Sequence, residues 1–61
     1  MTPFMQIVQE VFESARDAGN EDTLISCRRL VRASRSGKLR SPEFAADKAH
    51  VWFIYEEICC P

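Results

Sequence analysis

The sequence predicts a small all-α protein built from a helical hairpin and a third, aromatic-rich helix. Apolar residues recur at three- and four-residue intervals in two successive segments, which is the spacing of one helix face. The 2 Gly and 3 Pro residues fall at the ends of the predicted helices or outside them. A chain of 61 residues allows one domain, and it buries only about 60% of the surface that its unfolded form exposes. We therefore expect a single domain over residues 1–61, completed by dimerisation or by a partner.

The first predicted helix covers residues 3–18. Thr2 is a suitable N-cap and Pro3 suits the first helical turn. Gly19 stands where a left-handed residue ends many helices. The apolar positions form one wide stripe, made of Phe4, Ile7, Val8, Val11, Phe12, Ala15 and Ala18.

The second predicted helix covers residues 22–34, and either Asn20 or Asp22 can cap it. The break after the first helix is only about two or three residues long, which favours an antiparallel hairpin. Ile25 is the one large apolar residue expected on the outer face. The inner face is expected to hold Leu24, Cys27, Leu30, Val31 and Ser34.

The third predicted helix covers residues 42–59. Ser41, Pro42 and Glu43 supply a cap, a first-turn proline and a first-turn acid. The run at 51–55 consists of residues that favour strands, so a strand is the alternative there. We prefer a helix because the path from residue 42 has no break. Its inward stripe is expected to comprise Phe44, Val51, Tyr55 and Ile58.

This third segment contains more apolar side chains than a three-helix monomer can bury. At least one large aromatic side chain should therefore face outward, and contiguous apolar surface of this kind typically marks a protein interface. The alternative is a half-buried Trp52 at the end of the core. The residues expected at the interface are Val51, Trp52, Phe53 and Tyr55.

Charge is distributed in three bands although the net charge is only −1. Residues 1–22 carry five acids and one base, residues 23–41 carry six bases and no acid, and residues 42–61 carry four acids and one base. The basic band is a candidate contact for nucleic-acid phosphates or for an acidic protein. Its residues are Arg28, Arg29, Arg32, Arg35, Lys38 and Arg40.

Catalysis, metal binding and membrane insertion have little support. The only histidine, His50, and the three cysteines (Cys27, Cys59 and Cys60) show no ligand spacing typical of zinc, so we expect no metal and no cofactor. A chain this short has little room for a cleft with an oriented catalytic group, so we expect no enzyme. The odd cysteine count and the lack of a signal peptide or a spanning segment point to a reducing cytoplasm.

Two resemblances refine this expectation. Asp22-Thr23-Leu24, followed by Ala45-Ala46-Asp47, resembles the Hha/YmoA family of small helical modulators of nucleoid silencing proteins. That resemblance implies a helical protein that docks on a DNA-binding partner and exposes Asp47. In size, compactness and lack of motifs, the whole chain is similar to the accessory proteins of lambdoid phages, which implies a modulator that acts by binding.

Together these features predict a non-catalytic protein–protein interaction module, a small regulatory or accessory protein that binds a host or phage protein. The alternative is a nucleic-acid-binding protein that uses the basic face of the second helix and the loop after it.

Overall fold

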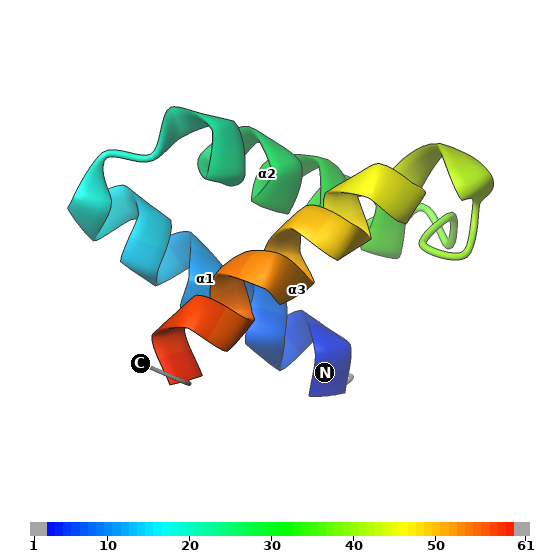
Figure 1. Ribbon diagram of the computed structural model, residues 1–61. Coiled ribbons are helices and arrows are strands. Elements are labelled where there is room, and N and C mark those ends of the chain that lie inside the picture. Colours follow the sequence, from blue (N-terminus) through cyan, green and yellow to red (C-terminus); the bar gives the residue numbers. More distant parts are fainter. Residues whose placement is uncertain (1–2, 60–61) are drawn as a thin grey trace.

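A computed structural model describes residues 3–59 and contains three helices in this range. Helix α1 spans Pro3–Ala18, α2 spans Glu21–Arg35 and α3 spans Ala45–Cys59. A short 3₁₀ turn, η1 (Pro42–Phe44), leads into α3 (Figure 1). The all-α fold class is confirmed. The run at 51–55 lies inside α3, so the preferred helix is confirmed there and the described residues contain no strand.

The turn between α1 and α2 forms as the sequence indicates. Gly19 adopts a left-handed φ of 70°, which a glycine reaches without a steric penalty. Of the two candidate caps, Asn20 is the one used: its side-chain oxygen accepts a hydrogen bond from the backbone N–H of Thr23 at 3.3 Å. The backbone N–H of Asn20 donates to the Ala15 carbonyl at 2.9 Å and ties the turn to the end of α1.

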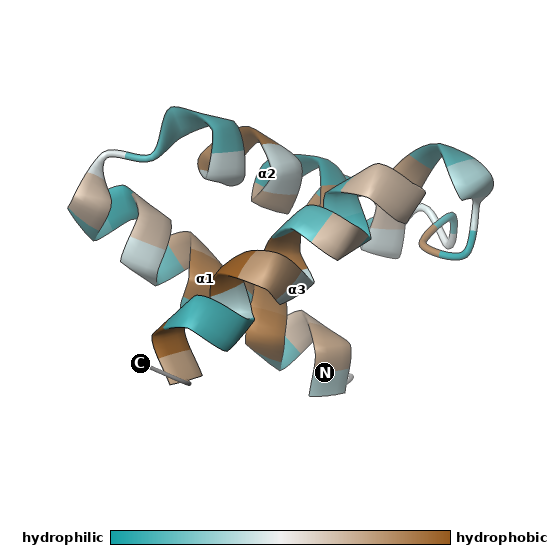
Figure 2. Cartoon of the chain, viewed as in Figure 1, coloured by the Kyte–Doolittle hydropathy of each residue, from teal (hydrophilic) through white to brown (hydrophobic). Residues whose placement is uncertain are grey.

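Helices α1 and α2 diverge from this turn, and α3 runs back from the loop and crosses α1 (Figure 1). Each helix packs on the other two. Where α3 crosses α1, both helices consist largely of hydrophobic residues, whereas the start of α2 is hydrophilic (Figure 2). This arrangement leaves one side of the α1–α2 pair without cover from α3.

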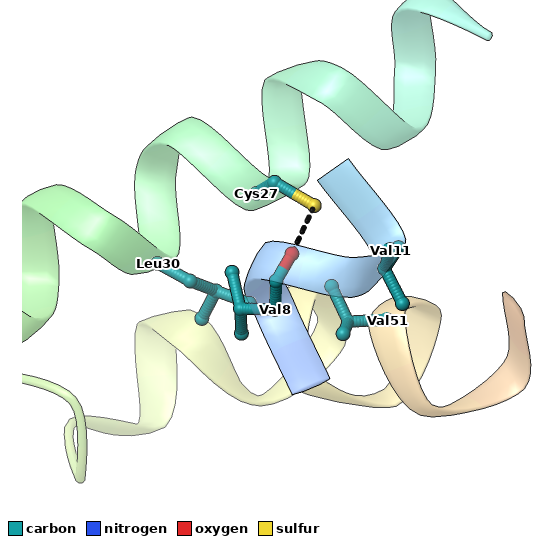
Figure 3. Close-up of a cluster of buried hydrophobic side chains, with 5 residues drawn as sticks. All are labelled: Val8, Val11, Cys27, Leu30 and Val51. Carbon is teal, nitrogen blue, oxygen red and sulfur yellow. Dashed lines mark hydrogen bonds between the residues drawn. The ribbon is translucent and has the colours of Figure 1, made fainter. Parts of the chain in front are cut away.

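The core lies where the three helices meet and is made of small or medium side chains. Val8 and Val11 come from α1, Cys27 and Leu30 from α2, and Val51 from α3 (Figure 3). The Cys27 thiol donates a hydrogen bond to the Val8 carbonyl, with 3.8 Å between sulfur and oxygen. Burial raises the pKa of this thiol from 9.0 to about 11, because the surroundings disfavour the charged thiolate.

The structure corrects part of the expected inward stripe of α3. Val51 is fully buried, and Phe44 and Tyr55 are half-buried, but Ile58 is 43% exposed. Ile54 packs against the core, although it was not expected to. The reason is that α3 crosses the other helices near its middle, so its last turn extends past them. Residue 58 has the right helical phase but no neighbouring helix to cover it.

Candidate binding surfaces

The first candidate surface is an open groove of about 990 Å³ between α1 and α2. Its floor is apolar, and one long side carries three arginines from successive turns of α2. None of the described residues that line it is acidic, and none belongs to α3. The lining residues are Met5, Val8, Gln9, Phe12, Arg28, Val31, Arg32, Ser34 and Arg35.

The groove exists because α1 and α2 each have an apolar face wider than their mutual contact. Val8 is buried in the core, whereas Met5, Phe12 and Val31 lie next to it and are only half-buried. Arg28 and Arg32 lie one turn apart on α2, beside these apolar side chains, and both arginines are exposed. The structure therefore places positive charge along the edge of an apolar trough.

Arg29 belongs to a different contact from the other three arginines of α2. Its Nε donates to an Asp47 carboxylate oxygen at 2.9 Å, and its guanidinium carbon lies 5.5 Å from the centroid of the Phe44 ring. This ion pair joins α2 to the start of α3, although its exposure limits its contribution to stability to at most about 1 kcal/mol. The Hha/YmoA resemblance implied that Asp47 is exposed, but its side chain is only 15% exposed in this structure.

A smaller hollow of about 370 Å³ lies on the other side of α2. Arg28 and Arg32 line it as well, together with Arg29 and Lys38, but so do Glu43, Phe44 and Ile25. The loop that follows α2 is held by backbone bonds, including one of 2.8 Å from the Lys38 N–H to the Ala33 carbonyl. Arg40 is exposed and lines neither hollow. The six basic residues therefore do not form one surface: Arg35 lines only the groove, Arg29 and Lys38 line only the smaller hollow, and Arg28 and Arg32 line both.

The second candidate surface is the outer face of α3. Trp52 is 44% exposed and Phe53 is 60% exposed. The Trp52 ring lies 6.0 Å, centroid to centroid, from the Phe4 ring of α1 and 6.0 Å from the Tyr55 ring, which it meets edge to face. These contacts cover part of Trp52 and leave 44% of its surface exposed.

Of the four residues expected at this interface, Val51 is placed elsewhere. It has no exposed surface and packs in the core, because it lies one residue before Trp52 and so points about 100° away around the helix. Tyr55 is half-buried at the edge. Contact with the Cys59 thiol raises the pKa of Tyr55 above its ordinary value, and the charge of Glu10 adds to this effect.

A polar contact that the sequence analysis missed joins α2 to α3. The Nε2 atom of His50 lies 3.0 Å from the Thr23 hydroxyl, and its Nδ1 atom lies 3.1 Å from the Ser26 hydroxyl. Both hydroxyls are buried, so the imidazole satisfies two groups that have little access to water. The sequence signal was the pair of small hydroxyl residues, Thr23 and Ser26, in phase with the inner face of α2.

No group of three or more His, Cys, Asp or Glu side chains within residues 3–59 is arranged to hold a metal ion. Cys60, one of the cysteines weighed as a ligand, lies outside the described residues. Over the same range, no helix is long and apolar enough to cross a membrane. Comparisons with protein-family models, with curated proteins and with solved structures found no match.

Proposed function

We propose that this chain is a non-catalytic protein-interaction module that binds an acidic amphipathic helix in the groove between α1 and α2. The observation that carries the proposal is the combination of an apolar floor with a row of arginines and no acidic lining residue. A helix that lies in a groove is recognised through apolar anchors spaced by three and four residues. The resemblance to small phage accessory proteins agrees with a modulator of this kind.

The length of the arginine row corresponds to two turns of such a ligand. Arg28 and Arg35 are seven residues apart on one helix, which corresponds to about 10 Å or two turns. Two turns of a partner helix can place two to three apolar side chains against Met5, Phe12 and Val31. Acidic residues on the flank of the same partner would meet the arginines, which steers the encounter and sets the orientation.

The test uses a fluorescein-labelled synthetic peptide of about 18 residues, with Leu at helical i, i+3, i+4 and i+7 spacing and Glu along both flanks. A matched peptide carries Lys in place of every Glu. We expect the acidic peptide to bind at least about tenfold more tightly in fluorescence anisotropy, because only its charge complements the arginines. Equal binding of the two peptides, or no binding of either, would overturn the proposal.

Two double variants locate the contact. Arg28→Glu with Arg32→Glu reverses two charges at the groove, and Lys38→Glu with Arg40→Glu reverses two charges in the loop outside it. We expect the first to weaken acidic-peptide binding by at least about tenfold and the second by less than about threefold. Equal losses would show that overall charge, and not the groove, governs binding.

Nucleic acid is the second candidate, favoured by one observation. Arg28 and Arg32 line both hollows, and Lys38 extends the basic surface into the loop. A labelled duplex titrated at two salt concentrations tests it, since phosphate contacts make affinity fall steeply with salt. Salt-dependent duplex binding that both double variants weaken would favour this candidate. The apolar floor of the groove gives a phosphate backbone no favourable contact, so we rank it second.

A further inference from the structure

We infer that two copies of this chain pair through the outer faces of their α3 helices, which run antiparallel in the pair. The inference does not depend on the groove, because no α3 residue lines the groove and pairing at α3 leaves it open. It concerns a different surface and a different occupant, namely a second copy of the same chain.

The first argument is that α3 carries large apolar side chains on its outer side as well as on its inner side. Val51 and Ile54 face the core, while Trp52 and Phe53 face outward. A helix that is hydrophobic all round is normally covered all round. Within residues 3–59, α1 and α2 cover mainly the inner side of α3. The apolar side chains on its outer side therefore remain exposed to solvent.

The second argument is the order of side-chain sizes along that outer face. Its N-terminal half presents Ala45, Ala46 and Ala49, and its C-terminal half presents Trp52 and Phe53, all of them exposed. A twofold axis near Ala49 would place each aromatic ring of one copy over an alanine of the other. Trp52 would then cover Ala45, and Phe53 would cover Ala46. The face is self-complementary in shape only when the two helices run antiparallel.

The third argument is charge. Near the start of α3 lie Lys38, Arg40 and Lys48, together with the acids Glu43 and Asp47, of which Asp47 is paired with Arg29. The end of the helix carries Glu56 and Glu57 and no base. Antiparallel pairing brings each acidic end near the more basic end of the other copy. Parallel pairing would place four carboxylates together and would be opposed by like-charge repulsion.

Size explains why such a chain would need a second copy. A domain of about 60 residues buries a small share of its surface and is marginally stable. The core of this one contains no aromatic side chain among its fully buried residues. Trp52 and Phe53 are therefore available to a partner, and buried aromatics are frequent anchors of interfaces.

The experiment is sedimentation equilibrium of the full chain with charge-swap variants at the centre of the face. The wild type should sediment as a dimer of about twice the 7.0 kDa chain mass. Ala49→Arg and Ala49→Glu should each weaken dimerisation by at least about thirtyfold, because residue 49 meets itself across the axis. Mixing these two variants should restore a dimer, since the two charges then attract.

Two controls define the face and the direction. Ile25→Arg adds the same charge at an exposed apolar residue of α2 and should leave the dimer intact. Mixing Ala45→Lys with Ala45→Glu should give no rescue, because residue 45 meets Trp52 in an antiparallel pair. Circular dichroism of each variant confirms that the exposed substitutions leave the helices folded.

Three outcomes would overturn the inference. A wild type that remains monomeric at millimolar concentration excludes self-pairing. A dimer unaffected by the Ala49 substitutions places the contact on another surface. Rescue by the mixture at position 45 shows parallel helices. None of these outcomes bears on peptide binding in the groove, so the two proposals fail separately.

Discussion

The crossing point of the three helices and the outer face of α3 differ in the size of their hydrophobic side chains. The crossing point holds aliphatic side chains, and the outer face holds larger aromatic ones. At the crossing point, Val8, Val11, Leu30 and Val51 have at most 1% of their surface exposed. On the outer face, Trp52 and Phe53 have about half of theirs exposed. Close approach of the helices leaves room at the centre for aliphatic side chains only. Trp52 and Phe53 remain at the surface, where they can contact another molecule, whereas four other aromatic side chains are half-buried around the core, namely Phe4, Phe12, Phe44 and Tyr55.

The largest expected effect comes from a cavity at the crossing point. Leu30→Ala should lower the free energy of unfolding by about 3 kcal/mol, through lost burial and the cavity left behind. Total stability for a chain of this size is about 3–9 kcal/mol, so a large part of it would be lost. Urea denaturation followed by circular dichroism measures the change.

The matched control is Leu30→Met, which keeps the volume and should cost less than about 1.5 kcal/mol. Equal midpoints for wild type and Leu30→Ala would contradict the view that this small cluster is the core.

A somewhat smaller effect is expected from alkaline pH at the same cluster. Burial raises the pKa of Cys27 from 9.0 to about 11. The folded state therefore holds this proton more tightly than the unfolded chain does. The stability linked to the site is complete below pH 9 and declines between pH 9 and 11, by up to about 3 kcal/mol.

The measurement compares wild type with Cys27→Ala at pH 7.5, 9 and 10.5. Tyrosines and lysines titrate in both proteins, so the difference between the two curves isolates the thiol. The wild type should lose more stability than the variant as the pH rises. Parallel curves would show that the thiol titrates alike in the folded and unfolded chains.

The smallest effect on the single chain is expected on the outer face of α3. Phe53→Ser should change the free energy of unfolding of the monomer by less than about 0.5 kcal/mol, since the ring is mostly in water already. Thermal unfolding at several protein concentrations checks this. The wild-type midpoint should rise with concentration through association, and the midpoint of the variant should not. A large loss at every concentration would place Phe53 in the core.

The helices themselves could be predicted closely from local signals. The first helix ends at the expected residues, and the second differs by one residue at each end. The third begins as a 3₁₀ turn at Pro42, where the proline and Ser41 indicated a helix start. The excess of apolar residues indicated that at least one large aromatic side chain faces outward, and Phe53 is 60% exposed. These features depend on neighbours within a few positions of one chain segment.

The binding surfaces could be predicted only in part. The arginines of α2 were recognised as a basic band, but not the apolar floor that α1 supplies beside three of them. The pairing of Arg29 with Asp47 and of His50 with Thr23 joins residues that are 18 and 27 positions apart. Helical periodicity gives the direction of each side chain but not the element that it meets.

The sequence by itself thus determined three helices, their ends and the surplus of apolar residues in the last of them, because caps, turns and periodicity act over short distances. Only the tertiary structure decided that α1 and α2 diverge into a groove, that Ile58 is exposed although it was expected on the same inward stripe as Val51, and that Trp52 and Phe53 share one outer face with three alanines. Those outcomes depend on the positions at which the helices cross, which are set by side-chain packing between distant segments.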